Sequence, residues 1–155
     1  MMMQTISYAQ DYSKSAWHIE AKDIDPNNYY GVTLANGMVG LVSSTKPMQV
    51  KDVVLNGAYD YYQRGRVSNI LKTFNHVNMN MIIGGVWVDE KTTSNYRQVL
   101  DMKEAKLITT FDVGDKATVK HTMMSLRHLP YTALTIVEIT AKEDVEINPQ
   151  AVIEA

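Results

Sequence analysis

The most constraining feature of this 155-residue chain is an alternation of apolar and polar side chains with a period of two. The alternation is clearest at 107–113, and it recurs at 77–83, 119–125 and 133–139. A strand with one buried face requires this period, whereas an amphipathic helix requires a period of 3.6. These segments are also rich in Thr, Val and Ile, which suit a pleated, half-buried surface. The pattern therefore predicts an all-β fold.

Turn-forming pairs separate the alternating segments. Asn36-Gly37 lies between two short apolar runs, and both residues accept the positive φ of a type I′ turn, so we expect a hairpin there. Four further pairs predict turns or weaker stops: Asn56-Gly57, Gly84-Gly85, Gly114-Asp115 and Leu129-Pro130. The spacing predicts an antiparallel sandwich of about ten short strands. Only residues 95–106 have room for a helical turn.

Length and composition exclude several classes of protein. The chain is long enough for one domain with a buried core. Its net charge is −2 and its Lys and Arg residues are scattered, so we expect no nucleic-acid partner. No apolar run approaches the length of a membrane span. The absence of Cys excludes disulfides, thiolate metal sites and a cysteine nucleophile.

The N-terminus has a feature of exported proteins. Ser7-Tyr8-Ala9 before Gln10 resembles the small-x-Ala end of a signal peptide. We therefore interpret 1–9 as a signal-peptide remnant and 10–155 as the folded domain, and we expect a periplasmic or secreted protein. The alternative is an ordinary frayed start with extra methionines. At the other end, 151–153 has the pattern of a strand, so we expect the parent protein to continue.

Candidate metal ligands are present, but their spacing argues against a metal site. Asp23, Asp25 and Asn27 have the spacing of a calcium loop. Asn28 stands where that loop needs glycine, and Leu34 where it needs a bidentate glutamate. The segment is therefore predicted to be a turn capped by its Asx side chains, with a looser calcium site as the alternative. The four histidines show no helical i, i+4 pair, and we expect those in strands to be hydrogen-bonded structural residues. We predict no metal and no cofactor.

The acidic residues do not form a catalytic pair. Glycoside hydrolysis needs two carboxyl groups that face each other across a sugar. Here the carboxylates are neighbours in turns: Asp89-Glu90, Asp112 with Asp115, and Glu143-Asp144-Glu146. The simplest interpretation is that these carboxylates are charged side chains exposed to solvent in turns. Since the chain also lacks a nucleophile elbow, a phosphate-binding glycine loop and an H-E-x-x-H motif, we predict no catalytic residue in it.

One loop has the composition of a saccharide contact. The segment 56–66 reads N-G-A-Y-D-Y-Y-Q-R-G-R. Tyrosine rings stack on the C–H faces of sugars, while Asn, Asp and Arg bind hydroxyl groups. The substrate-proximal candidates are Asn56, Tyr59, Asp60, Tyr61 and Arg64. The alternative is a surface loop at an interface with a partner domain, where Tyr and Arg are also enriched.

Three segments, in this order, resemble the N-terminal region of glycoside hydrolase family 65. Residues 30–41, YGVTLANGMVGL, resemble the Asn-Gly hairpin near the start of these proteins. Residues 96–111, YRQVLDMKEAKLITTF, are similar to their Leu-Asp-Met strand pair, and 124–128, MSLRH, to an Arg-containing strand end. The likeness spans most of 17–147. The loop 56–65 diverges from it, which leaves the substrate open.

The resemblance implies an N-terminal antiparallel β-super-sandwich that packs on a separate catalytic (α/α)6 barrel. In this family the barrel holds the general-acid glutamate, and water or phosphate attacks an α-linked glucose disaccharide such as maltose, trehalose or kojibiose. A homodimer and an oligosaccharide ligand are further expectations. The family sandwich is longer than this chain, so the domain is expected to be truncated at its C-terminus. If the parent protein is exported, we expect water rather than phosphate as the acceptor.

Two other functions fit the same residues. A free-standing carbohydrate-binding module would present an exposed aromatic platform, for which Tyr59 and Tyr61 are the candidates because alternation places them on one strand face. A structural sandwich without a ligand would present a wholly polar solvent face. The three hypotheses share the fold and differ in what the loop 56–66 contacts.

Overall fold

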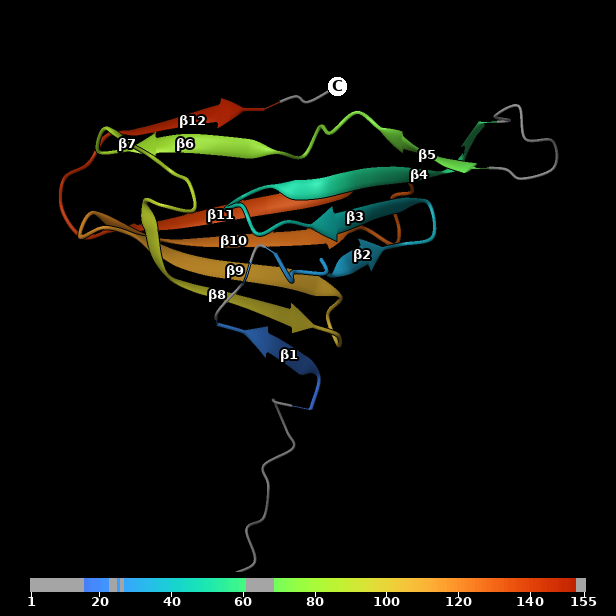
Figure 1. The fold of residues 1–155 in the computed structure, drawn as a ribbon, viewed down its shortest axis with the longest axis horizontal. Coiled ribbons are helices and arrows are strands. Elements are labelled where there is room, and N and C mark those ends of the chain that lie inside the picture. Colours follow the sequence, from blue (N-terminus) through green and yellow to red (C-terminus); the bar gives the residue numbers. More distant parts are fainter. Residues whose placement is uncertain (1–15, 23–24, 26, 61–68, 153–155) are drawn as a thin grey trace, which may run out of the picture.

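The computed structural model describes residues 16–22, 25, 27–60 and 69–152, with the backbone alone at 58–60 and 69–71. These residues form twelve strands (Figure 1): β1 His18–Ala21, β2 Thr33–Ala35, β3 Val39–Ser43, β4 Val50–Asp60, β5 Asn69–Thr73, β6 Met79–Ile83, β7 Val86–Trp87, β8 Thr93–Asp101, β9 Lys106–Val113, β10 Ala117–Ser125, β11 Ala133–Ala141 and β12 Ile147–Ala151. The predicted all-β class is confirmed. No helix in this part of the chain is long and apolar enough to cross a membrane.

Three antiparallel sheets build the sandwich. The largest has five strands in the order β1-β8-β9-β10-β11. A four-stranded sheet, β2-β3-β4-β5, and a three-stranded sheet, β12-β6-β7, lie over one face of it (Figure 1). Neighbouring strands within each of these sheets are antiparallel, which agrees with the short turns between successive strands.

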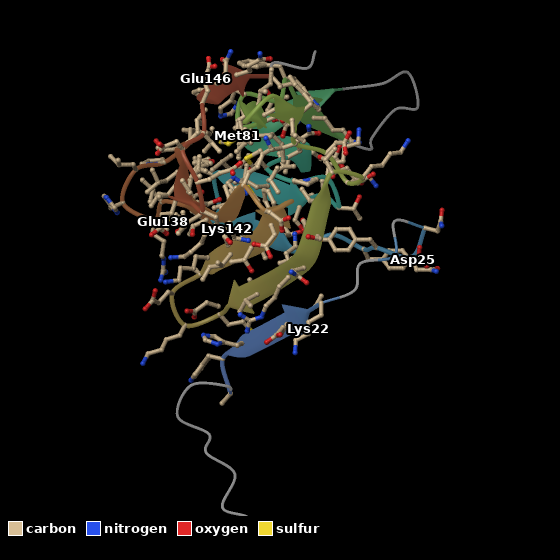
Figure 2. All side chains as sticks on the ribbon, turned by 90° about the vertical axis from the view of Figure 1, so that its left-hand side faces the viewer. Lys22, Asp25, Met81, Glu138, Lys142 and Glu146 are labelled. Carbon is tan, nitrogen blue, oxygen red and sulfur yellow. The ribbon has the colours of Figure 1, made fainter. Side chains whose placement is uncertain are left out.

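The large sheet buries one face against both smaller sheets and forms two apolar clusters. The first cluster includes Phe111 and Val119 of the large sheet and Met81 of β6, which Figure 2 labels between the layers. The second includes Leu107 and Met123 of the large sheet. Its partners on the four-stranded sheet are Leu34, Val39, Leu41, Val50 and Val53. The odd-numbered residues of 107–113 are all buried, as the alternation predicted.

A polar row separates the two clusters. Gln98, Thr109 and His121 are cross-strand partners on β8, β9 and β10, and all three are buried. The Tyr29 hydroxyl lies against this row: it donates to Gln98 Oε1 at 2.7 Å and lies 2.6 Å from Ser43 Oγ. Buried polar groups need such partners, because an unpaired one retains its desolvation cost.

The type I′ turn expected at Asn36-Gly37 does not form there, and Gly84-Gly85 forms one instead. β2 and β3 are joined by 36–38, in which Gly37 has φ +92° and Asn36 does not have a positive φ. Asn36 Oδ1 instead accepts hydrogen bonds from Met38 N and Val39 N, both at 2.9 Å. Gly84-Gly85 joins β6 to β7 with φ +54° and +79°, which is the pattern of a two-residue type I′ hairpin.

Two segments that are not predicted to be strands are part of strands with bulges. A strand end is predicted at Asn56-Gly57, and a helical turn is allowed within 95–106. β4 runs through Asn56-Gly57, where its pairing with β5 shifts and Gly57 has φ +90°. β8 occupies the start of 95–106, and its pairing with β9 shifts near Asn95, whose φ is +51°. A bulge admits extra residues without ending the strand, so a turn-forming pair alone does not distinguish the two cases.

The side chains of Asn75 and Asn78 have a role that the alternation of residues does not predict. Asn75 Nδ2 donates to the carbonyl of Val50 at 3.0 Å, and Asn78 Oδ1 accepts from Val50 N at 2.7 Å. Both side chains are buried. These two side chains therefore satisfy the backbone N–H and carbonyl of Val50, as a neighbouring strand would, at the point where the four-stranded sheet meets the three-stranded sheet.

We expect Asp112→Asn to lower the free energy of unfolding by about 1–2 kcal/mol at pH 7, measured by urea denaturation. Asp112 accepts hydrogen bonds from Asn95 Nδ2, Thr118 Oγ1 and Lys142 Nζ at 2.7, 2.5 and 3.1 Å. These donors lower the pKa of its carboxyl to about 2, so its contribution is present above pH 4 and lost as the pH falls towards 2. The exposed neighbour Asp115 is the matched control. An Asp115→Asn effect as large as that of Asp112→Asn would refute the assignment.

Candidate functional site

One end of the sandwich gathers the features that a binding surface needs. We call it the loop end, and it comprises the turns 36–38, 102–105 and 126–132, at the right in Figure 1. The strand register places the last two turns at the same end of the large sheet, because Asp101 pairs with Lys106 and Ser125 with Ala133. The first turn joins them through a hydrogen bond of 2.7 Å from Asn36 Nδ2 to the carbonyl of Leu126.

Asn56, a predicted substrate-proximal residue, lies at the loop end. Its backbone N donates to the carbonyl of Met38 at 2.8 Å, and its Nδ2 donates to the carbonyl of Gly37 at 3.0 Å. The side chain therefore holds the β2–β3 turn against β4. An apolar groove of about 240 Å³ lies beside it, lined in part by Met38 and Val54.

The other predicted saccharide contacts are less fully described. Tyr59 and Asp60 belong to β4, and their backbones pair with Ile70 and Asn69 of β5. Tyr61 and Arg64 lie outside the described residues, as do the predicted signal-peptide remnant and the residue Asp23 of the Asx turn. A saccharide contact by this loop stays a prediction.

A larger cleft lies elsewhere, and its described lining residues do not include a catalytic pair. It has a volume of about 830 Å³ and lies between the start of β8 and the residues Lys22 and Asp25. Figure 2 labels Lys22 and Asp25 on its border. Asp25 is the one acidic residue among its described lining residues, and Asn27 N and Asn28 Nδ2 already donate to it. Hydrogen bonding from Asn27, and then from Asn28, lowers the pKa of Asp25, as expected for a capped turn.

Arg97 and Asn95, two of the polar residues that line this cleft, already form hydrogen bonds with carboxylates of neighbouring strands. Arg97 donates to both carboxylate oxygens of Glu20 at 2.8 and 2.7 Å, which fastens β1 to β8. This bidentate pair, mainly through its hydrogen bonds, lowers the pKa of Glu20 to about 2. Asn95 is bound to Asp112. The described residues that line the cleft therefore offer no convergent set of unused polar groups for a sugar.

Within the described residues, no three His, Asp or Glu side chains could hold a metal ion together. The histidines instead have separate environments. His18 Nε2 lies 3.4 Å from Asp101 Oδ2, His76 packs on Phe74, and His128 is exposed at the loop end. His121 is 1% exposed, and its Nε2 has no hydrogen-bond partner. The expectation of a hydrogen-bonded structural histidine is therefore wrong for this atom, and burial lowers the pKa of the imidazole to about 4.

Sequence reasoning missed the apolar character of the loop end. Leu129 and Tyr131 flank Pro130 in the β10–β11 connection, and about half of each side chain is exposed. Turns are normally polar, so large apolar residues beside a proline are a usable indication in the sequence. The pair Leu129-Pro130 by itself predicts only a turn.

A family model described as "Glycosyl hydrolase family 65, N-terminal domain" matches residues 31–155. The chain belongs to glycosyl hydrolase family 65. The resemblance of the hairpin at 30–41 and of the strand pair at 96–111 is thereby confirmed. These two segments form β2–β3 and β8–β9 of the family 65 domain.

Two curated relatives of the family 65 domain carry the same name. A kojibiose hydrolase of Mucilaginibacter mallensis is 51% identical over 142 residues, and a kojibiose hydrolase of Flavobacterium johnsoniae is 43% identical over 143 residues. Each match covers 92% of this chain and 21% of the relative. The chain therefore spans about a fifth of the length of these relatives, and it corresponds to one part of a larger protein.

Proposed function

We propose that this chain is the non-catalytic N-terminal domain of a hydrolase that cleaves kojibiose, an α-linked glucose disaccharide. The observation that carries the proposal is the coverage of the two kojibiose hydrolases: the chain aligns along 92% of its own length and 21% of theirs. The remaining length is enough for a separate catalytic domain. By the family resemblance we expect that domain to be an (α/α)6 barrel on which this sandwich packs.

The environments of the carboxylates support a non-catalytic role. An inverting glycosidase holds its acid and its base roughly 6.5–9.5 Å apart on opposite sides of the sugar. The general acid also needs a raised pKa so that it remains protonated near neutral pH. In this domain the pKa values of Asp25, Asp89, Asp101 and Asp112 are instead lowered, because backbone or side-chain donors stabilise each carboxylate. These groups are suited to holding turns and strands.

The full-length protein is expected to convert kojibiose to two molecules of glucose. Incubation with kojibiose, with and without inorganic phosphate, followed by chromatography of the products, tests this. Glucose at the same rate in both samples is the expected result, because the names of both relatives specify hydrolysis. Formation of glucose 1-phosphate would overturn the choice of water as the acceptor, and no turnover of kojibiose would overturn the substrate.

A second arm of the experiment tests the non-catalytic role. Replacement of each acidic residue of this domain by its amide, one at a time in the full-length protein, is expected to change kcat by less than about threefold. Loss of a catalytic acid or base costs about 100- to 10,000-fold. A loss of that size in a variant whose circular dichroism and melting temperature are unchanged would place a catalytic residue in this domain.

Three further expectations stay proposals. A periplasmic or secreted location depends on residues 7–10, which lie outside the described residues. A homodimer depends on the family resemblance, and an oligosaccharide on the loop 56–66 depends on the composition of that loop. N-terminal sequencing of the mature protein addresses the first, and light scattering with ligand titration addresses the others.

A further inference from the structure

Exposed apolar side chains are concentrated at the loop end. Eleven large apolar or aromatic side chains are exposed among the described residues. Six of them lie at the loop end or on β11 beside it, with exposed fractions of 37–53%: Trp17, Met102, Leu129, Tyr131, Leu134 and Ile136. Trp17 belongs to this group because its carbonyl accepts a hydrogen bond of 2.8 Å from Met102 N. Apolar surface gathered in this way marks an interaction site on a folded protein.

Two of these exposed side chains, Leu134 and Ile136, lie on the outer face of the large sheet. Leu134 pairs with Met124, and Ile136 with Thr122, on the face that points away from both apolar clusters. Further along β11 the same face becomes charged, because Glu138 forms an ion pair of 2.6 Å with Lys120. The apolar surface therefore begins at the loop end, extends over two rows of β11, and ends at this ion pair.

The backbone of the β10–β11 connection is held in a defined conformation by two hydrogen bonds. Leu126 N donates to the carbonyl of Thr132, and Thr132 N donates to the carbonyl of Leu129, at 3.0 and 3.2 Å. Tyr131 has φ +61°, a left-handed conformation that is rare for an aromatic residue. Such strain persists where the surrounding structure imposes it, and it often accompanies a binding role. An ordered loop also loses less conformational entropy when a partner binds.

The opposite end of the sandwich has a different surface. Its turns contain the charged residues Asp115, Lys116, Lys142, Glu143 and Asp144. Two of these residues hold the turns together: Lys142 N donates to the carbonyl of Lys116, and Lys116 Nζ to that of Gly84, at 2.8 and 2.9 Å. Figure 2 views the molecule from this end and labels Lys142 and Glu146. Charged residues are depleted at the cores of protein interfaces, whereas aromatic residues and Met are enriched.

We propose that the loop end, with Leu134 and Ile136, is the surface on which the rest of the parent protein packs. The proposal rests on the proposed function and names the surface that the function uses. The occupant is a face of the catalytic part, apolar at its centre and acidic at its rim. The relatives contain nearly four-fifths of their length outside the matched region, which supplies such a face. Lys103 and Arg127 are exposed at the loop end and form no ion pair within the described residues, which favours an acidic rim.

Cysteine labelling of the full-length protein tests the proposal. These 155 residues contain no Cys, so a label on a peptide from them reports only the introduced residue. Leu129→Cys probes the loop end, Asp115→Cys the opposite end, and Gln150→Cys the exposed edge strand β12. Each variant is treated with a maleimide, and the labelled peptide is quantified by mass spectrometry. We expect Cys at position 129 to react at least about tenfold more slowly than Cys at 115 and 150, with equal rates in urea.

The other outcomes separate the surface from the function. Slow labelling at 115 or 150 with fast labelling at 129 would overturn the loop end as the docking surface while leaving the packing of the domain intact. Fast labelling at all three positions would overturn the packing itself and with it that part of the proposed function. Protection at 129 that disappears on dilution would identify a second copy of the protein as the occupant and would also overturn the proposal.

Discussion

The free energy of unfolding is expected to fall by about 2 kcal/mol when the pH is lowered from 7.5 to 5, because His121 is buried as a neutral imidazole. Burial lowers its pKa from 6.5 to about 4 in the folded chain. Between these values the unfolded chain binds a proton that the folded chain does not bind. Stability is therefore present above pH 6.5 and is lost as the pH falls towards 4. Urea unfolding at a series of pH values measures the loss.

Two replacements of His121 and one control assign the effect. His121→Phe and His121→Leu both remove the titrating group, and the pair covers the case in which one of them packs badly. In either variant the difference in stability between pH 7.5 and pH 5 should largely disappear. His128→Asn alters an exposed histidine and should retain the full difference. An unchanged pH dependence in both His121 variants would show that another group is responsible.

Phe111→Ala is expected to lower the free energy of unfolding by about 3–5 kcal/mol, more than the loss expected for Asp112→Asn or from the titration of His121. Phe111 is 1% exposed, lies in the first apolar cluster and stacks on Tyr96 with ring centroids 6.2 Å apart. The replacement removes most of a side chain from a site enclosed by two layers, so the cavity cannot collapse fully. Domains are stable by only about 5–15 kcal/mol, so the variant should be substantially unfolded near its usual working temperature.

Phe74→Ala is the matched control for this large effect. Phe74 is 59% exposed and contacts His76 at a ring distance of 5.6 Å. We expect its loss to change stability by less than about 1 kcal/mol, since most of its surface is already in water. Phe111→Leu, which restores much of the lost volume, should recover part of the difference. Equal midpoints of urea unfolding for Phe111→Ala and Phe74→Ala would contradict the placement of Phe111 in the core.

The alternation of apolar and polar side chains is sufficient to predict the strands, because every second residue of a strand must face the core. It cannot predict which side chains compensate for interruptions between sheets. Asn75 and Asn78 appear as polar residues next to a strand, and their function depends on Val50, about 25 residues away. The type I′ hairpin is expected at Asn36-Gly37 and is found at Gly84-Gly85. The strand register explains the difference: Ala35 pairs with Gly40 and Asn36 N donates to the carbonyl of Val39, so the central residues of the turn are Gly37 and Met38. The Asn36 side chain supports this turn by accepting hydrogen bonds from Met38 N and Val39 N.

The candidate site is less predictable than the fold. Composition favours the loop 56–66, and its first residue does lie at the loop end. The exposed side chains Trp17, Met102 and Tyr131 come from three distant segments, and only the strand register brings them together. The environment of His121 could not be predicted either, because alternation determines its face but not the absence of a partner for Nε2.

The polar row between the two apolar clusters has a consequence for how the domain opens. β9 and β10 cross the row and contribute side chains to both clusters. The three-stranded and four-stranded sheets each cover only one cluster. Either small sheet can therefore detach in a partial unfolding event while the other remains in place, whereas the central pair of strands separates only when the whole domain unfolds. Amide hydrogens of β9 and β10 should accordingly exchange last.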